Sequence, residues 1–172
     1  MSPEYLKAKV REVKDFPIPG ILFKDITPLL EDRVSFCYIL EQLASHFRQK
    51  KIDKVIGIDA RGFLLASGVA YLLNAGMAIV RKKGKLPCET IACEHNLEYG
   101  KGVLEIHADA IKKDERVLVV DDVLATGGTA EAAARLAEQL KGMVVGFGFL
   151  IELPLGGRKL LSKYNICSLI QY

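Results

Sequence analysis

Six short apolar runs, separated by longer amphipathic segments, constrain the fold of this chain more than any other feature. Most of these runs are continuously apolar, as in RVLVVD and VVGFGFLI, which is typical of strands covered on both faces of a parallel sheet. The alternation predicts an α/β fold with a mostly parallel twisted sheet flanked by helices. We expect strands at 54–58, 77–81, 103–107, 116–121, 144–151 and 166–170, and helices at 3–14, 32–50, 62–73 and 129–140.

Length and charge limit the classes of protein that remain. A chain of 172 residues, half of them hydrophobic, is long enough to bury a sizeable core as a single domain over 1–172. The net charge of +3 is too small to predict nucleic-acid binding, which usually needs a concentrated basic face. The first 16 residues contain no apolar signal region, so we expect a cytoplasmic protein. The uncharged stretch 62–80 is broken by polar residues and predicts a buried helix and strand rather than a membrane span.

The four cysteines form no CxxC pair, so we expect reduced thiols. Cys88, Cys93 and His95 lie close together in the sequence and could in principle supply three soft metal ligands. Because no second cluster completes a tetrahedral set, we interpret them as unrelated residues of one polar segment.

Two segments fall outside the α/β alternation. Residues 16–28 are rich in Pro and Gly, and residues 82–102 are polar and long for a connection in so small a domain. Both are candidates to cover a site at the carboxyl end of the sheet, where open α/β folds bind ligands.

The stretch VLVVDDVLATGGTA at 117–130 predicts an anion site. A buried strand ends in two adjacent acids, and a turn of small residues then opens a helix, whose free N–H groups and dipole favour a phosphate. Carboxylates beside a phosphate repel it unless they face hydroxyl donors or a metal, so the ligand should carry vicinal hydroxyls, as ribose 5-phosphate does. The expected contacts are Asp121, Asp122, Ala125, Thr126, Gly127, Gly128 and Thr129.

This segment resembles the signature of the type I phosphoribosyltransferases, which bind 5-phosphoribosyl 1-diphosphate (PRPP). FPIPGILFKDITPLL (16–30), GIDARGF (57–63), RKKGKLP (81–87), LEYGKGVLEI (97–106) and FLIEL (149–153) are similar to members that act on adenine, in the same order. The resemblance implies transfer of the phosphoribosyl group to a purine with Mg²⁺ as cofactor, a homodimer, a hood at about 1–30 and a mobile catalytic loop at about 82–102.

The resemblance also implies a role for each matching residue. The two acids would contact the ribose hydroxyls, and the turn that follows would hold the 5-phosphate. Arg61, in a loop that has a non-proline cis peptide in relatives, would lie near the diphosphate. Mg²⁺ would be held mainly by PRPP and water, with no direct protein ligand. The residues expected to neutralise the diphosphate are Arg81, Lys82 and Lys85.

On the purine side, Glu98 and Tyr99 match the acidic and aromatic pair of the mobile loop, with the glutamate over the purine N7. The catalytic residues expected are therefore Glu98, Arg61 and Tyr99. Ala125 stands where relatives acting on hypoxanthine and guanine carry an aspartate, which favours adenine. The hood of the adenine enzymes reads the base largely through backbone groups, which here indicates Leu22, Phe23 and Lys24. In some relatives, arginine is common at the position of Lys24.

Two alternatives stay open on the sequence alone. One is the same chemistry on another purine, such as hypoxanthine or xanthine, and the other is a non-catalytic PRPP-binding regulator. The retained Glu98 and the complete RKKGK stretch favour an enzyme, and the length leaves no room for an added DNA-binding domain.

Overall fold

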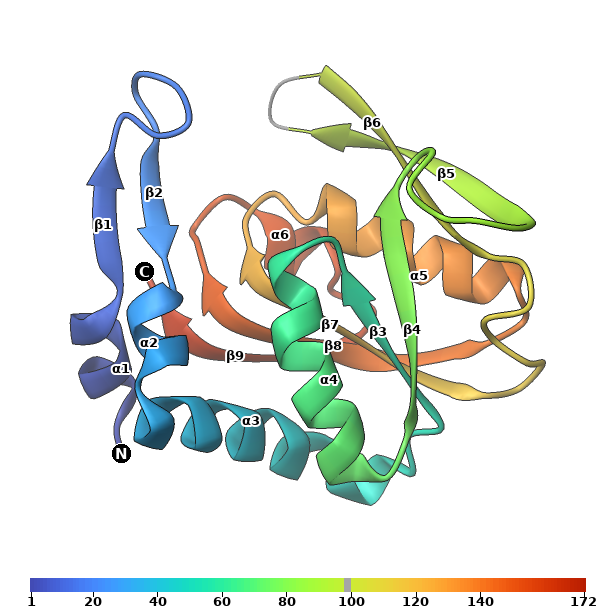
Figure 1. Cartoon of the computed structure of the whole chain (residues 1–172), viewed down its shortest axis with the longest axis horizontal. Helices are drawn as coiled ribbons and strands as arrows, with labels where there is room; N and C mark the ends of the chain where they lie inside the picture. The colour runs from blue at the N-terminus through green and yellow to red at the C-terminus, as the bar shows by residue number, and fades with distance from the viewer. Residues whose placement is uncertain (98–99) are drawn as a thin grey trace.

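A seven-stranded sheet forms the centre of the computed structural model, which describes residues 1–97 and 100–172 (Figure 1). The strand order is β5-β6-β4-β3-β7-β8-β9. The five strands from β4 to β9 in this order are parallel, and β6 runs antiparallel to both β4 and β5. The mostly parallel α/β fold predicted from the apolar runs is confirmed. The strands are β3 (Lys54–Ile58), β4 (Gly76–Lys82), β5 (Thr90–Leu97), β6 (Gly100–His107), β7 (Arg116–Leu124), β8 (Met143–Glu152) and β9 (Asn165–Gln171).

Helices cover both faces of the sheet, and β7 shows how the core divides between them. Val117 and Val119 pack with α5 in one apolar cluster, whereas Leu118 and Val120 pack with α3 and α4 in the other. Because successive side chains of a strand point to opposite faces, a continuous apolar run feeds both layers. The helices are α1 (Pro3–Lys9), α2 (Thr27–Glu31), α3 (Arg33–Phe47), the 3₁₀ turn η1 (Arg48–Lys50), α4 (Arg61–Leu73), α5 (Gly128–Gln139) and α6 (Gly157–Leu160).

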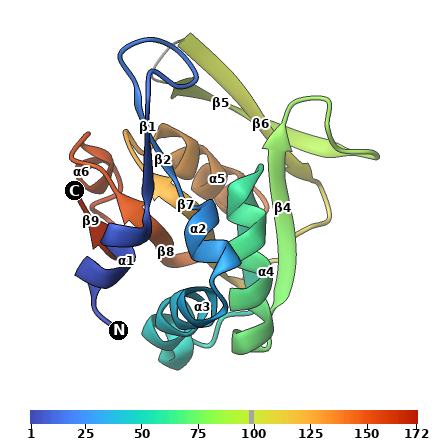
Figure 2. The ribbon, with the colours of Figure 1, turned by 60° about the vertical axis from the view of Figure 1, so that its left-hand side comes forward.

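The N-terminal segment forms a hood beside the sheet. Strands β1 (Arg11–Lys14) and β2 (Leu22–Asp25) pair as an antiparallel hairpin after α1. This hairpin and the β5–β6 hairpin extend toward the same end of the molecule, the top of Figures 1 and 2. The hood is attached to the far end of the chain, because Lys7 Nζ donates a hydrogen bond to the carbonyl of Gln171 at 2.7 Å.

Two expectations about local structure were wrong. The helix expected over 3–14 ends at Lys9, because the chain continues as β1 and pairs with β2. The segment 82–102, expected to be a loop, contains β5 and the start of β6, which pair with each other. In β5 the buried Cys93 and His95 alternate with the exposed Ala92 and Glu94, so one face of this strand packs against α5. Among the described residues, no helix combines the length and the apolar character that crossing a bilayer would need.

Candidate active site

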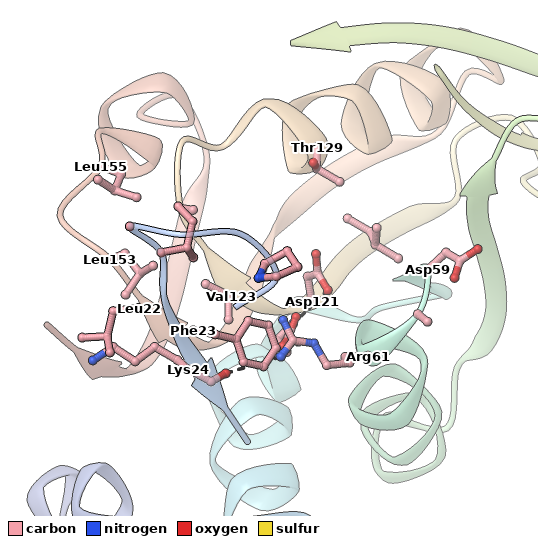
Figure 3. A pocket seen from close by; sticks show the side chains of 17 residues that line it. Leu22, Phe23, Lys24, Asp59, Arg61, Asp121, Val123, Thr129, Leu153 and Leu155 are labelled. Carbon is pink, nitrogen blue, oxygen red and sulfur yellow. Dashed lines mark hydrogen bonds and ion pairs between the residues drawn. The ribbon is translucent and has the colours of Figure 1, made fainter. Parts of the chain in front are cut away.

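A cavity of about 500 Å³ opens at the carboxyl ends of β3 and β7, under the hood (Figure 3). Four parts of the chain meet there, which agrees with the place where open α/β folds bind ligands. The lining residues are Pro17, Gly20, Ile21, Leu22, Phe23 and Lys24 from the hood, Ile58, Asp59, Ala60 and Arg61 after β3, Asp121, Asp122, Val123, Ala125 and Thr129 from β7 to α5, and Leu153 and Leu155 after β8.

The two adjacent acids of β7 lie at the floor of this cavity. Asp122 is 5% exposed, and Asp121 Oδ1 accepts a hydrogen bond from the backbone N–H of Asp122 at 2.9 Å. Burial and the neighbouring Asp122 charge raise the pKa of Asp121 well above its ordinary value. Burial also raises the pKa of Asp122, although the Arg61 guanidinium opposes it. The pair is therefore suited to a ligand that donates hydrogen bonds.

The turn after β7 exposes the N-terminus of α5. Gly127 caps the helix with φ +88°, and no side chain makes the capping hydrogen bond, so backbone N–H groups are free to bind an anion. The backbone of Gly157 packs against this turn, and a Cβ on Gly127 would lie 3.0 Å from Gly157 Cα. Of the five turn residues predicted from the sequence, Ala125 and Thr129 line the cavity, and the other three, Thr126, Gly127 and Gly128, complete the turn.

Arg61 connects the acid pair to the hood. Its Nε lies 2.9 Å from Asp122 Oδ2, and its guanidinium carbon lies 4.7 Å from the centre of the Phe23 ring (Figure 3). Its Nη1 also donates to the carbonyl of Lys24 at 3.4 Å. The peptide bond between Asp59 and Ala60, just before Arg61, is cis. The sequence resemblance implied a position near the diphosphate, and the structure places this side chain on Asp122 and Phe23.

The predicted basic residues lie beside the cavity rather than in its lining. Arg81 Nε donates to Asp59 Oδ2 at 3.0 Å, and Arg81 Nη1 donates to the carbonyl of Lys85 at 3.1 Å. Lys82 and Lys85 are exposed. Arg81 thus ties the turn after β4 to Asp59, a residue of the cavity wall.

The three hood residues predicted to contact the base differ in orientation. Leu22 and Phe23 line the cavity, with the Phe23 ring against Arg61. The Lys24 side chain points away from Arg61, is 9% exposed, forms an ion pair with Glu12 and lies 3.8 Å from the centre of the Tyr172 ring (Figure 3). The contact of Lys24 with Arg61 is made by its backbone carbonyl.

Two further sequence predictions concern the purine-facing residues and a possible metal site. Glu98 and Tyr99, the residues predicted to act on the purine, lie outside the described residues. Within the described ranges, no three His, Cys, Asp or Glu side chains gather closely enough to hold a metal ion.

The sequence analysis missed several residues of the cavity wall. Leu153 and Leu155 line the side of the cavity opposite Asp59 (Figure 3). Leu153 ends the FLIEL motif that the resemblance had already indicated. Asp59 was recognised only as part of a loop, and its pairing with Arg81 has no signal in the sequence, because the two residues are 22 positions apart.

The fold and the site together, with paired acids before the turn that opens α5 at the carboxyl end of a parallel sheet, agree with the type I phosphoribosyltransferases that the sequence resembles. The Phosphoribosyl transferase domain family matches residues 33–170. The adenine phosphoribosyltransferase of Solibacter usitatus is 53% identical over 168 residues, covering 97% of both chains. That of Brachyspira hyodysenteriae is 52% identical over 168 residues, covering 97% of this chain and 99% of the relative.

Solved structures agree with these relatives. The crystal structure of adenine phosphoribosyltransferase from Thermoanaerobacter pseudethanolicus has a TM-score of 0.96 and 49% identity, covering 99% of this chain and 100% of that one. The Giardia lamblia enzyme complexed with 9-deazaadenine has a TM-score of 0.93 and 35% identity, covering 100% of this chain and 98% of that one. The chain therefore belongs to the adenine phosphoribosyltransferase family.

Proposed function

We propose that this chain transfers the 5-phosphoribosyl group from PRPP to adenine, giving AMP and diphosphate, as in purine salvage. The observation that carries the proposal is a single cavity that joins the acid pair of β7, the free N-terminus of α5 and an apolar hood. The relatives named above support adenine as the base, and the Giardia lamblia structure contains the adenine analogue 9-deazaadenine.

The geometry suggests how PRPP would lie in this cavity. The 5-phosphate would accept hydrogen bonds from backbone N–H groups at the start of α5, and the Thr129 hydroxyl can add a donor. The ribose hydroxyls would donate to Asp121 and Asp122, whose pKa values are raised chiefly by burial, and such donors favour the charged carboxylates. The anomeric carbon would then face the hood.

The diphosphate would lie toward the Asp59–Ala60–Arg61 turn, with Arg81, Lys82 and Lys85 beside it. Mg²⁺ fits this arrangement through the oxygens of PRPP and water, because Mg²⁺ prefers oxygen ligands and keeps several waters. When bound, Mg²⁺ would neutralise charge on the diphosphate. The carboxylates that line the cavity, Asp59, Asp121 and Asp122, could accept hydrogen bonds from its waters.

Adenine would lie between the hood and the far wall, near Phe23, Leu153 and Leu155. In the reaction the bond from the anomeric carbon to the diphosphate oxygen breaks and its electron pair leaves with diphosphate, while the bond to the purine N9 forms and the N9 proton is released to water. Cationic groups beside the diphosphate stabilise the charge that develops on the leaving group. Glu98 and Tyr99, assigned to the purine by the sequence resemblance, belong to this proposal as well, and Glu98 would form a hydrogen bond with the purine N7.

The decisive experiment is product formation from PRPP and Mg²⁺ with adenine, hypoxanthine, guanine and xanthine supplied separately. AMP from adenine alone supports the proposal, and comparable turnover of another base would favour the wider purine specificity. Binding of PRPP without any nucleotide product would favour a regulator. Glu98→Gln should lower kcat with adenine if that carboxyl acts on the purine, while PRPP binding stays within about twofold.

A homodimer in the cytoplasm is also part of the proposal. The outer face of α4 carries Leu64, 48% exposed, and Tyr71, 85% exposed, and large exposed apolar side chains are common at protein interfaces. Light scattering on wild type and Tyr71→Glu would test this face, since a dimer that uses it should weaken in the variant. Cell fractionation would test the location.

A further inference from the structure

Glu105, in the middle of β6, is a buried carboxylate without a role in the reaction described above. It is 5% exposed, and its Oε1 accepts hydrogen bonds from the backbone N–H groups of Lys85 and Leu86, both at 3.0 Å. Burial raises the pKa of Glu105, but the N–H groups of this turn outweigh that effect and leave the pKa below its ordinary value. Burying a carboxylate costs free energy unless it is hydrogen-bonded. The N–H groups of the turn offset this cost for Glu105, and Glu105 in turn holds the turn in place.

The topology of the sheet explains why a carboxylate lies there. Since β6 lies between β4 and β5, the connection from β4 to β5 must cross β6 (Figure 1). Leu104 and Ile106 point into the core cluster that contains α5. The alternation of the strand therefore directs Glu105 and His107 to the other face. His107 Nε2 lies 2.8 Å from the carbonyl oxygen of Pro87, so two side chains of β6 hold the crossing segment.

The crossing segment carries the basic turn, defined here as residues 82–86. Glu105 binds the N–H of Lys85, while Arg81 Nη1 binds the carbonyl of the same residue at 3.1 Å. Arg81 is in turn held by Asp59, which lines the cavity. The peptide groups on both sides of Lys85 are thus fixed relative to the cavity wall, and the lysine side chains stay exposed.

We propose that Glu105 is a positioning residue that shapes the basic turn to receive the diphosphate group of PRPP and of the product. Its negative charge is directed at backbone N–H groups, so the turn is held in place while the lysine ammonium groups remain available to the ligand. This inference rests on the proposed function, because it assigns the diphosphate to that turn.

Two substitutions distinguish the role of Glu105 as a hydrogen-bond acceptor from the role of its negative charge. Glu105→Gln keeps an oxygen acceptor, and both hydrogen bonds to the turn use a single oxygen of Glu105. Glu105→Leu removes the acceptor. We expect Glu105→Leu to raise the KM for PRPP and the inhibition constant of diphosphate about tenfold, the effect of one or two lost hydrogen bonds. The affinity for AMP, which has no diphosphate, should stay within about twofold, and Glu105→Gln should restore most of the loss.

A matched control is Glu115→Leu. Glu115 Oε2 also accepts a backbone hydrogen bond in a turn, from Lys112 at 2.9 Å, but at the amino end of β7. This variant should leave diphosphate inhibition unchanged. If Glu105→Leu does not fold, Glu105→Met replaces it, because methionine is similarly long and is only a weak acceptor.

Two results would overturn the proposal. One is a loss of AMP affinity in Glu105→Leu as large as the loss for diphosphate, which would mean general disruption of the site. The other is a Glu105→Gln variant as impaired as Glu105→Leu. A wild-type protein that makes no AMP would instead refute the proposed function, and direct binding of diphosphate and AMP to the variants would still test Glu105.

Discussion

Arg61 Nε lies 2.9 Å from Asp122 Oδ2, while the same guanidinium lies over the Phe23 ring. One side chain thus connects the acid pair of β7 to the hood. If the ribose hydroxyls also bind Asp122, as proposed, substrate binding would be coupled to the contact between Arg61 and the hood.

Arg61→Lys tests that connection. A lysine ammonium can pair with Asp122, but it lacks the planar fork that also reaches the Lys24 carbonyl and stacks on Phe23. We expect kcat/KM to fall about tenfold, which corresponds to roughly 1.4 kcal/mol. Arg135→Lys, at an exposed residue paired with Glu131 on α5, is the control and should keep wild-type kinetics. Unchanged steady-state kinetics for Arg61→Lys would show that the connection is not used.

Asp121→Asn should stabilise the free protein and impair the reaction. The substitution removes a carboxyl whose pKa is raised by burial and by its acidic neighbour. We expect Tm without ligand to rise by a few degrees, since roughly 1 kcal/mol corresponds to about 2–4 °C at this chain length. We expect kcat/KM to fall about 10- to 100-fold, the value of a hydrogen bond to a charged group. Asp109→Asn, at an exposed acid, is the control.

The same carboxyl makes stability depend on pH. Because the pKa of Asp121 is higher in the folded than in the unfolded chain, the folded state binds more protons between the two values. This group's contribution to stability is therefore greatest below the ordinary value of 3.8 and falls as pH rises toward the raised pKa. The Tm advantage of Asp121→Asn over wild type should increase with pH across that interval. A constant difference would contradict this account.

Asp32 should show the opposite dependence. Its carboxylate accepts hydrogen bonds from Lys9 Nζ at 2.5 Å and from the Ser35 N–H at the start of α3, and Lys9 is the larger cause of a pKa lowered to about 2. Its contribution is complete above the ordinary value of 3.8 and is lost as pH falls through about 2. Thermal unfolding should show Asp32→Asn less stable than wild type at neutral pH, with the gap closing in acid. Asp114→Asn, at an exposed acid, is the control.

Gly157→Ala should disturb the turn between β7 and α5. A Cβ at Gly157 would lie 2.5 Å from the Ala125 carbonyl oxygen and 2.6 Å from Leu124 Cδ1. Since overpacking typically costs about 1–3 kcal/mol, we expect lower stability and weaker binding of both PRPP and AMP, which share the 5-phosphate. Diphosphate inhibition should change little. Gly76→Ala is the control, because its nearest contact is the flexible end of Lys54 at 3.3 Å. Unchanged AMP affinity would show that α6 does not support the turn.

The parts of the fold that sequence could predict are those with strong local patterns. The apolar runs of β3, β7 and β8 and the acid pair before a glycine turn carry their structure in consecutive residues. By contrast, β1 and β2 are short and polar, and their pairing depends on a partner across the hairpin. The strand β5 lies at the sheet edge, and only one of its faces is covered. Its sequence therefore contains polar residues among the apolar ones and resembles the sequence of a loop.

The candidate site divides in the same way. Asp121, Asp122 and the turn after them were predicted because one continuous segment supplies them. The contact of Arg61 with Asp122 joins residues from separate strand ends, and the role of Glu105 follows from a crossing that only the strand order reveals. Such relationships depend on tertiary structure and leave no local pattern to detect.

The attachment of the hood to β9 also affects the order in which parts of the chain fold. The hydrogen bond from Lys7 to Gln171 joins residues 164 positions apart, whereas the turn between β7 and α5 is built mainly from neighbours in the sequence. Bringing together residues that are so far apart in the sequence costs conformational entropy, and this cost is offset only once the contacts between them have formed. We therefore expect a folding chain to form the turn between β7 and α5 early and to attach the hood to β9 last, after most of the sheet has formed.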